Sequence, residues 1–310
     1  MKVFLAGASG ALGRRLVPAL LEAGHQVTGM TRSQESAERI RESGAEAVVC
    51  DVFDREQLTR AVRQAAPEVI VHQLTALPAA FDIRKIDYGP TNRLRTEGTR
   101  NLIDAGVAAG ASRFVSQSIA FMYAPDGTST ASEDDAVYTQ APAPFGEAVS
   151  ATEDGDRQVV EASGMAGLVL RYGFFYGPGT YYASDGSAAN ETRKRRHPVA
   201  GDGSGVFSWI HVDDAAAATV AAVERGSPGI YNICDDEPAP MRDWVPLYAQ
   251  ALGAKRPFKV PLWVARLAVG PLAVHFATGL RGASNAKAKR ELGWQPRYAS
   301  WREGFREALG

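Results

Sequence analysis

The feature that most constrains this chain is a glycine turn close to its first residue. Gly7, Gly10 and Gly13 follow an apolar run, Lys2–Ala6, and open an amphipathic stretch, Ala11–Ala23. Gly7 permits a tight turn, Gly10 permits a pyrophosphate to approach the backbone, and Gly13 permits helix and strand to pack closely. The amide groups at the start of the next helix favour an anion. A glycine triplet between a strand and a helix therefore predicts a dinucleotide site.

The first half of the chain alternates between short apolar runs and helical stretches. Apolar runs are typical of strands that are buried on both faces of a parallel sheet. The predicted strands are Lys2–Ala6, Gln26–Met30, Glu46–Cys50, Glu68–Leu74, Arg113–Gln117 and Leu168–Tyr172. The predicted helices between them are Ala11–Ala23, Gln34–Glu42, Glu56–Gln64 and Thr91–Ala109. The alternation predicts an α/β fold, a Rossmann-type doubly wound parallel sheet with a smaller C-terminal substrate lobe.

The pattern loosens from about Tyr176, where glycine- and proline-rich pieces separate short helices. We predict a dinucleotide-binding domain over residues 1–175, to which 206–234 return, and a substrate lobe over 176–205 and 235–310. The long polar segment Pro125–Pro144 is either a lid or a disordered surface loop. The basic stretch Glu191–His197 is predicted to be helical, and is either a solvated face or a grip for an anion. Asp213 is expected to cap the alanine-rich helix that follows, with His211 bracing the turn.

Composition excludes several classes of function. The net charge of −1 gives no reason to expect a nucleic-acid or membrane partner, and no apolar stretch is long enough to cross a bilayer. The first residues run straight into the glycine turn, so no signal peptide is expected there. Cys50 and Cys234 have neither metal-ligand nor redox spacing, so we predict no metal site and a cytoplasmic location. The expected partner is a small-molecule substrate, and a homodimer stays open.

The end of the second predicted strand indicates which cofactor is preferred. Thr31-Arg32-Ser33 contains a base, and no carboxylate follows until Glu35. A carboxylate here would bind the ribose 2′-hydroxyl of NAD, whereas an arginine accommodates the 2′-phosphate of NADP. We therefore predict NADP(H) as the preferred cofactor, with NAD(H) open if Arg32 stacks on the adenine instead.

Together with later motifs, the glycine turn resembles the extended short-chain dehydrogenase/reductases, also called NAD-dependent epimerase/dehydratases. The resemblance covers nearly the whole chain. The later motifs are Asp51-Val52, Leu74-Thr75-Ala76, Asn92 with Glu97–Asn101, Leu170–Gly179, His211–Asp214 and Lys287–Pro296. The predicted cofactor-binding residues are Gly7, Ser9, Gly10, Ala11, Leu12, Gly13, Arg32, Asp51, Val52, Leu74, Thr75, Ala76, Ser116, Tyr172 and Phe174.

The chain departs from the family where the chemistry is expected. The family uses a Tyr with a Lys four residues later, because the Lys lowers the tyrosine pKa from about 10 and lets the phenol exchange a proton. Phe145 and Val149 stand at the matching positions, and no Tyr in this sequence has a Lys four residues on. The family's Ser/Thr position falls on Ser118 or on Ile119, and a backbone hydrogen bond is an equally good role for Ser118. The candidate catalytic residues are Ser118, Tyr123 and Tyr176.

The expected substrate pocket is apolar and lined by aromatic rings, which suits a flat or hydrophobic molecule better than a sugar. The expected lining residues are Met122, Tyr123, Phe145, Tyr172, Phe174, Phe175, Tyr176, Tyr181 and Tyr182, which are aromatic except for the methionine. The leading hypothesis is an atypical NADP(H)-dependent oxidoreductase that acts on a small or medium hydrophobic or aromatic metabolite. Its acceptor would need little acid help, as an iminium ion or a conjugated enone does. The alternatives are a nucleotide-sugar epimerase or dehydratase, and a redox sensor that binds NADP(H) without turnover.

Overall fold

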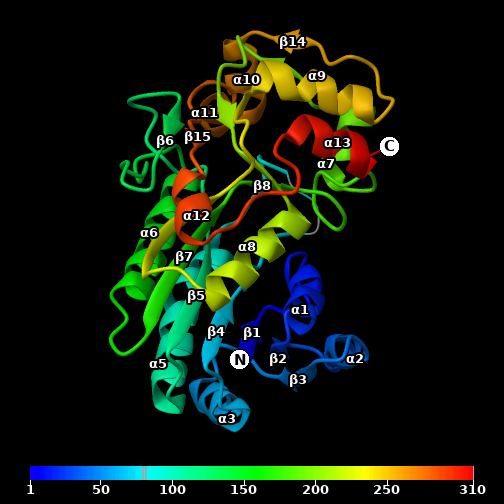
Figure 1. Ribbon diagram of the computed structural model, residues 1–310. Helices are drawn as coiled ribbons and strands as arrows, with labels where there is room; N and C mark the ends of the chain where they lie inside the picture. The colour runs from blue at the N-terminus through cyan, green and yellow to red at the C-terminus, as the bar shows by residue number, and fades with distance from the viewer. Residues whose placement is uncertain (79, 81, 310) are drawn as a thin grey trace.

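Seven parallel strands form the central sheet of the computed structural model, which describes residues 1–78, 80 and 82–309 (Figure 1). Their spatial order is β12 (Gly229–Ile233), β7 (Ala166–Tyr172), β5 (Arg113–Ile119), β4 (Val69–His72), β1 (Lys2–Ala6), β2 (Gln26–Thr31) and β3 (Glu46–Val49). The chain moves outward from β1 to β3 and then returns to the other side of β1 with β4. This reversal is the topological switch point at which doubly wound sheets bind their ligands. The predicted fold class is therefore confirmed.

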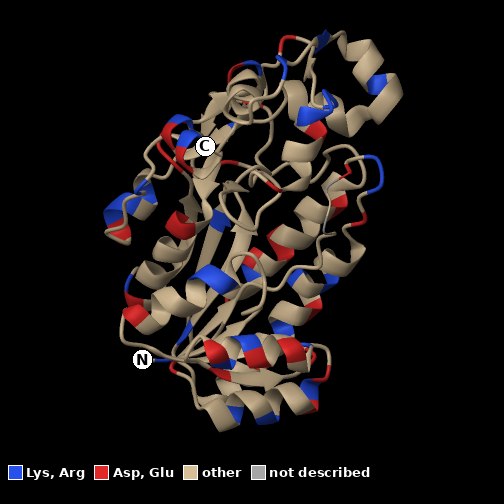
Figure 2. Cartoon of the chain, turned by 90° about the vertical axis from the view of Figure 1, so that its right-hand side faces the viewer, with Lys and Arg blue, Asp and Glu red and all other residues tan. Residues whose placement is uncertain are grey.

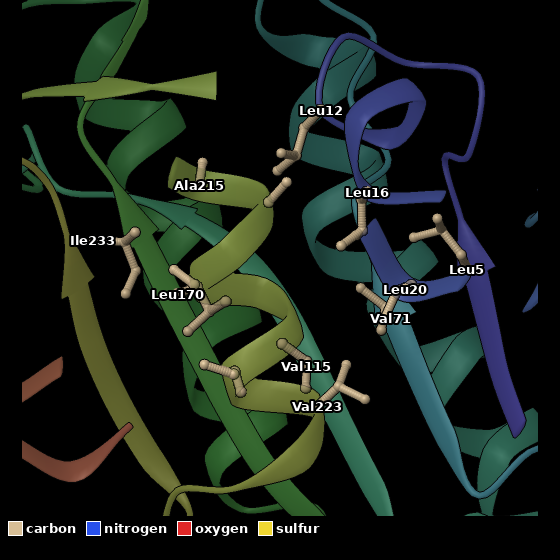
Figure 3. Close-up of a cluster of buried hydrophobic side chains, with 14 of the residues drawn as sticks. Leu5, Leu12, Leu16, Leu20, Val71, Val115, Leu170, Ala215, Val223 and Ile233 are labelled. Atoms are coloured by element: carbon tan, nitrogen blue, oxygen red, sulfur yellow. The ribbon is translucent and has the colours of Figure 1, made fainter. Parts of the chain in front are cut away.

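Helices cover both faces of the sheet. The helices are α1 (Gly13–Glu22), α2 (Gln34–Glu42), α3 (Arg55–Ala65), α4 (Gly89–Arg93), the π-helical η1 (Leu94–Gly98), α5 (Thr99–Ala109), α6 (Phe145–Val160), α7 (Ser187–Arg193), α8 (Val212–Glu224), α9 (Met241–Ala251), α10 (Leu262–Val269), α11 (Pro271–Thr278), α12 (Ala286–Glu291) and α13 (Trp301–Leu309). Leucine and alanine side chains of α1 and α8 pack on one face, against valines and leucines of the strands (Figure 3). Side chains of α3 and α5 pack on the other face. The central strands thus bury both faces under helices, which is consistent with their mostly apolar sequences.

The C-terminal part of the chain adds four two-stranded pairs to this sheet. They are β6 (Thr130–Ala131) with β15 (Gly282–Ala283), β8 (Phe174–Tyr176) with β11 (Trp209–His211), β9 (Val199–Ala200) with β14 (Lys259–Val260), and β10 (Val206–Phe207) with β13 (Ala239–Pro240). In each pair the two strands lie far apart in sequence. A separate aromatic core holds this part together; it includes Trp209, Trp244, Trp301 and Phe305.

Two local predictions need correction. The predicted basic helix Glu191–His197 is wrong in its bounds, because α7 ends at Arg193 and Arg195 has a positive φ of 58°. Such a backbone angle does not continue a right-handed helix. The cap of α8 was also assigned to the wrong residue: Nδ1 of His211 accepts the hydrogen bond from the Asp213 amide, and Asp213 lies within the first turn.

The long segment between β5 and α6 is tied to the C-terminal part. Strand β6 pairs with β15, and the Arg281 guanidinium donates to the carbonyls of Thr128 and Ala124 and to the Asp135 carboxylate, at 2.6, 3.2 and 2.7 Å. These contacts argue against the disordered loop that was one of the two predictions for Pro125–Pro144.

The charged surface is mixed in sign. Lys and Arg alternate with Asp and Glu along the outer helices (Figure 2), as the net charge of −1 suggests. Among the residues that the structure describes, no helix has the length and apolar character needed to span a membrane.

Candidate functional site

The glycine turn forms a cradle at the switch point of the sheet. Gly7 has a φ of 95°, and a Cβ there would lie 2.7 Å from the carbonyl oxygen of Gln73, which follows β4. A Cβ on Gly13 would lie 2.2 Å from the Gly7 oxygen, so only glycine allows α1 to start this close to β1. The Cβ of a larger residue at Gly10 would meet nothing closer than 3.4 Å. The backbone at Gly10 is therefore open on its outer side, which is what the approach of a dinucleotide pyrophosphate would require.

Most of the other predicted cofactor residues lie along the same edge of the sheet. The turn and Arg32, Asp51-Val52 and Leu74–Ala76 follow β1, β2, β3 and β4, which are neighbours in the sheet. Ser9 and Arg32 are exposed, and the Ser9 and Thr31 hydroxyls lie 3.2 Å apart. Parallel strands thus bring residues from the whole stretch Gly7–Ala76 to one edge of the sheet. This arrangement supports the prediction of a single dinucleotide site.

Local hydrogen bonds fix this edge. The exposed carboxylate of Asp51 accepts from the Phe53 amide at 3.0 Å, and the Val52 carbonyl accepts from the Asn101 side chain at 3.0 Å. The Leu74 amide donates to His72 at 3.2 Å, and the Ala76 amide donates to the Thr91 hydroxyl at 3.1 Å. These bonds hold the strand ends in place without using Thr75, whose side chain is exposed.

Three predicted cofactor residues take part in internal contacts instead. Ser116 is 6% exposed and lies at the middle of β5, where it pairs in register with His72. The Tyr172 hydroxyl accepts from Gln73 at 3.2 Å and pairs with the Thr219 hydroxyl at 2.7 Å. The Phe174 ring stacks on Phe121 at 4.1 Å. A role for these three in cofactor binding stays a prediction.

An aromatic cluster lies where the sheet meets the C-terminal part. We define it as Tyr88, Phe121, Tyr138, Phe145, Phe174, His275 and Phe276. Phe145 is at its centre, with ring centroids 6.3 Å from Phe121, 5.4 Å from Phe276 and 6.2 Å from Tyr88. Val149, one turn further along α6, is fully buried beside it. The first turns of α6 at this edge of the sheet therefore bury Phe145 and Val149, and neither side chain can exchange a proton.

Ile119 packs against the buried side chains around Phe145. Ser118 is 1% exposed and lies beside the buried ion pair of Asp156 and Arg171. Its hydroxyl stabilises the ionised Asp156 carboxylate and so lowers the pKa of that group. The two charged groups lie 3.0 Å apart. Burial raises the pKa of Asp156, and the Arg171 guanidinium opposes that rise. This placement favours Ile119 over Ser118 at the family's Ser/Thr position.

Tyr123 belongs to the same polar network, and Tyr176 does not. The Tyr123 hydroxyl donates to Asn232 at 2.7 Å and accepts from Arg171 at 3.1 Å, while burial raises its pKa to about 12. Tyr176 is fully buried against Trp209, His211 and Phe305, and burial raises its pKa further. The three candidate catalytic residues are therefore interior groups, and only Ser118 and Tyr123 lie near each other. Their catalytic role stays a prediction.

The remaining polar motifs have structural roles. The Asp214 carboxylate accepts the amides of Arg297 and Tyr298 at 2.8 and 3.0 Å, which ties α8 to the segment before α13. In the basic run, Arg193 donates to the Ser184 carbonyl and Lys194 pairs with Glu191. The sequence-based reasoning did not identify Tyr88, Phe121, Tyr138, His275 or Phe276. No local signal could have found them, because they come from four separate segments.

The doubly wound sheet and its glycine cradle define a protein that binds a nicotinamide-type dinucleotide. The model of the NAD dependent epimerase/dehydratase family matches residues 3–234. The chain belongs to this family, as the resemblance predicted.

Two of the relatives found are reductases. The 3-diazoavenalumate denitrifying reductase of a Streptomyces species is 46% identical over 306 residues, which are 98% of this chain and 99% of that protein. The 2-alkyl-3-oxoalkanoate reductase of Stenotrophomonas maltophilia is 28% identical, over 83% of this chain and 77% of that protein. The chain is thus an enzyme of the NAD(P)-dependent oxidoreductase type.

Solved structures agree on the fold. The dTDP-glucose 4,6-dehydratase of Streptomyces venezuelae with NAD bound has a TM-score of 0.77 and 20% identity, over 100% of this chain and 96% of that chain.

Proposed function

We propose that this enzyme is an NADP(H)-dependent reductase that removes a diazo group from an aromatic carboxylate as N₂. The observation that carries the proposal is the buried apolar pair Phe145 and Val149 on α6, at the positions where the family resemblance expects Tyr and Lys. The 46% identical reductase, whose name joins a diazo substrate to denitrification, supplies the chemical class.

The proton balance connects this chemistry to the apolar site. Reduction of a ketone consumes a hydride and a proton, so it needs an acid beside the acceptor. A hydride and an arenediazonium ion together give an arene and N₂, with atoms and charge balanced and no proton consumed. The bound cofactor supplies the hydride. An enzyme for this reaction has no need of a Tyr whose pKa is lowered by a Lys.

The aromatic cluster favours the proposed acceptor in a second way. A planar arene packs well against rings at centroid distances of 4.5–7 Å, and a cationic diazonium group is attracted to the faces of such rings. Phe145, Phe121 and Phe276 meet at 5.4 and 6.3 Å in this cluster. A sugar, which needs many hydrogen-bond partners, would be poorly satisfied here.

The alternatives from the sequence fit less well. An epimerase or dehydratase begins by oxidising a sugar hydroxyl, and that step needs a base where Phe145 lies. A redox sensor without turnover does not account for a full-length relationship to a reductase.

The test uses 4-carboxybenzenediazonium as the acceptor and 4-acetylbenzoate as a ketone of similar shape. We expect NADPH loss, benzoate and N₂ to appear one for one with the diazonium ion, well above the rate without protein, and no turnover of the ketone. Brisk reduction of the ketone without reduction of the diazonium ion would refute the proposal.

The cofactor preference is tested separately, since it depends on Arg32 alone. Arg32 is exposed and directly follows β2. Between β2 and Glu35 there is no carboxylate, and Glu35 itself pairs with Arg39. Calorimetric titration should show tighter binding of NADP(H) than of NAD(H), and the difference should collapse in Arg32→Ala. Equal binding of both cofactors by the unchanged protein would contradict the preference.

The thiols fit the cytoplasmic location that we propose. Cys50 and Cys234 are free and buried, and burial raises the pKa of both. Thiols of this kind are unreactive and need no oxidising compartment.

A further inference from the structure

His275 is the histidine of the aromatic cluster, and its side chain is buried. It lies on α11, and the residue is 8% exposed. Within the part of the chain that the structure describes, Nε2 has no hydrogen-bond partner. A buried polar atom without a partner is costly and calls for an explanation, of which a catalytic role is one.

The ring of His275 is held beside the position of the missing tyrosine. Its centroid lies 6.1 Å from Phe145 and 5.2 Å from Tyr138. A Cβ at Gly279 would lie 2.7 Å from Nδ1, so glycine makes room for this ring. Phe145, Tyr138 and Phe276 surround it with apolar surface, and burial by itself lowers its pKa to about 4. At neutral pH the imidazole is therefore uncharged and can accept a proton.

Resting on the function proposed above, we propose that His275 is the catalytic base and acid of the step that releases N₂. Hydride addition to the terminal nitrogen of the diazonium ion gives an aryldiazene, whose N–H proton must leave before N₂ can form. Nε2 accepts that proton, and the N–H electron pair becomes the third N–N bond. The C–N bond breaks with its electron pair on carbon, and the imidazolium returns the proton to that carbon. Atoms and charge balance, and the histidine is regenerated.

This role differs from that of the family tyrosine. The proton moves between two atoms of the substrate and is not supplied from outside, so a single isolated imidazole is enough. Its isolation from charged groups is consistent with this task, since a neighbouring carboxylate would hold the imidazolium and slow the return of the proton.

The matched control is His197. This second histidine is also buried in the C-terminal part, and burial lowers its pKa to about 4. It packs on Trp244 at 5.1 Å, its Nδ1 pairs with the Thr192 hydroxyl at 3.1 Å, and it is not part of the aromatic cluster. A general effect of losing a buried imidazole would therefore appear in both variants.

The experiment follows two signals in single turnovers with 4-carboxybenzenediazonium: NADPH absorbance for hydride transfer, and N₂ for the second step. In His275→Gln and His275→Phe we expect hydride transfer within about threefold of the unchanged enzyme and N₂ release slower by about 10²-fold or more. His197→Gln should change neither. The phenylalanine variant keeps an aromatic ring, so it serves if the glutamine variant does not fold. Equal slowing of both signals, or none, would overturn the assignment.

Binding gives a readout that needs no cofactor. 4-Cyanobenzoate has the shape of the diazonium ion and cannot react. Its titration should shift the NMR signals of the His275 ring and leave those of His197 in place. If the unchanged enzyme transfers no hydride to the diazonium ion, the proposed function fails. If it does and His275 is unaffected by 4-cyanobenzoate, only the role of His275 fails.

Discussion

Replacing Asp156 by Asn should destabilise the protein strongly, because it removes one partner of a buried ion pair. Asp156 and Arg171 are 3.0 Å apart, and their side chains are only 6% and 5% exposed. Arg95, also buried, is close enough to feel the same carboxylate. Asn in place of Asp would leave two buried guanidinium groups without a carboxylate among their partners.

The expected loss is about 3–5 kcal/mol of the free energy of unfolding, as for other buried pairs broken from one side. Since every 1.4 kcal/mol is about tenfold in an equilibrium constant, the unfolded fraction should rise roughly a hundredfold to several-thousandfold. Asp154→Asn provides the control on the same helix. Asp154 pairs with Arg157, which is 59% exposed, so its loss should remove about 0–1 kcal/mol.

Urea unfolding at pH 7 measures both variants. The midpoint should fall sharply for Asp156→Asn at unchanged slope, and hardly at all for Asp154→Asn. If the two variants lose the same free energy within about 1 kcal/mol, the pair is not a buried ion pair in the working protein, and our interpretation of the network around Tyr123 fails with it.

Two other predictions concern the contact of Asp135 with Arg281, which anchors the segment between β5 and α6, and the glycine cradle. Hydrogen bonds from Ser132 and from Arg281 lower the pKa of Asp135 to about 2, so its contribution to stability is complete above about pH 4 and is lost as the pH falls toward 2. Asp135→Asn should abolish that part of the acid dependence in pH-resolved thermal melts, and an unchanged profile would contradict the anchor. Gly13→Ala should lower the melting temperature, because its Cβ would lie 2.2 Å from backbone. Gly10→Ala, with 3.4 Å of clearance, should melt normally but bind NADP(H) more weakly in titration; normal binding there would contradict the cradle.

Local chemistry decided most of the fold. The bounds of α2 match the sequence prediction, Gln34–Glu42, because the helix has a serine cap at Ser33 and a polar stretch that ends at Ser43-Gly44. The prediction Lys2–Ala6 matches β1. The other strand predictions differ by one or two residues at their ends, as between Glu68–Leu74 and β4, since strand ends depend on the neighbouring strands. The basic helix was misplaced because charge spacing does not reveal a residue with positive φ such as Arg195.

The cofactor edge and the reaction site differ in how far the sequence could specify them. The common position of the glycine turn, Arg32 and Asp51 was predictable because parallel strands deliver each loop to the same edge, whatever the loop contains. From the resemblance to the family, the sequence likewise predicted that Phe145 and Val149 stand where the family has its Tyr and Lys. Tertiary structure alone decided that Ser118 turns toward Asp156, that Ile119 faces Phe145, and that α11 brings His275 beside them. The contact between His275 and Phe145 joins segments more than a hundred residues apart in the sequence, and the other two contacts join a strand to the helix that follows the long loop. Only the packing of the folded chain determines them.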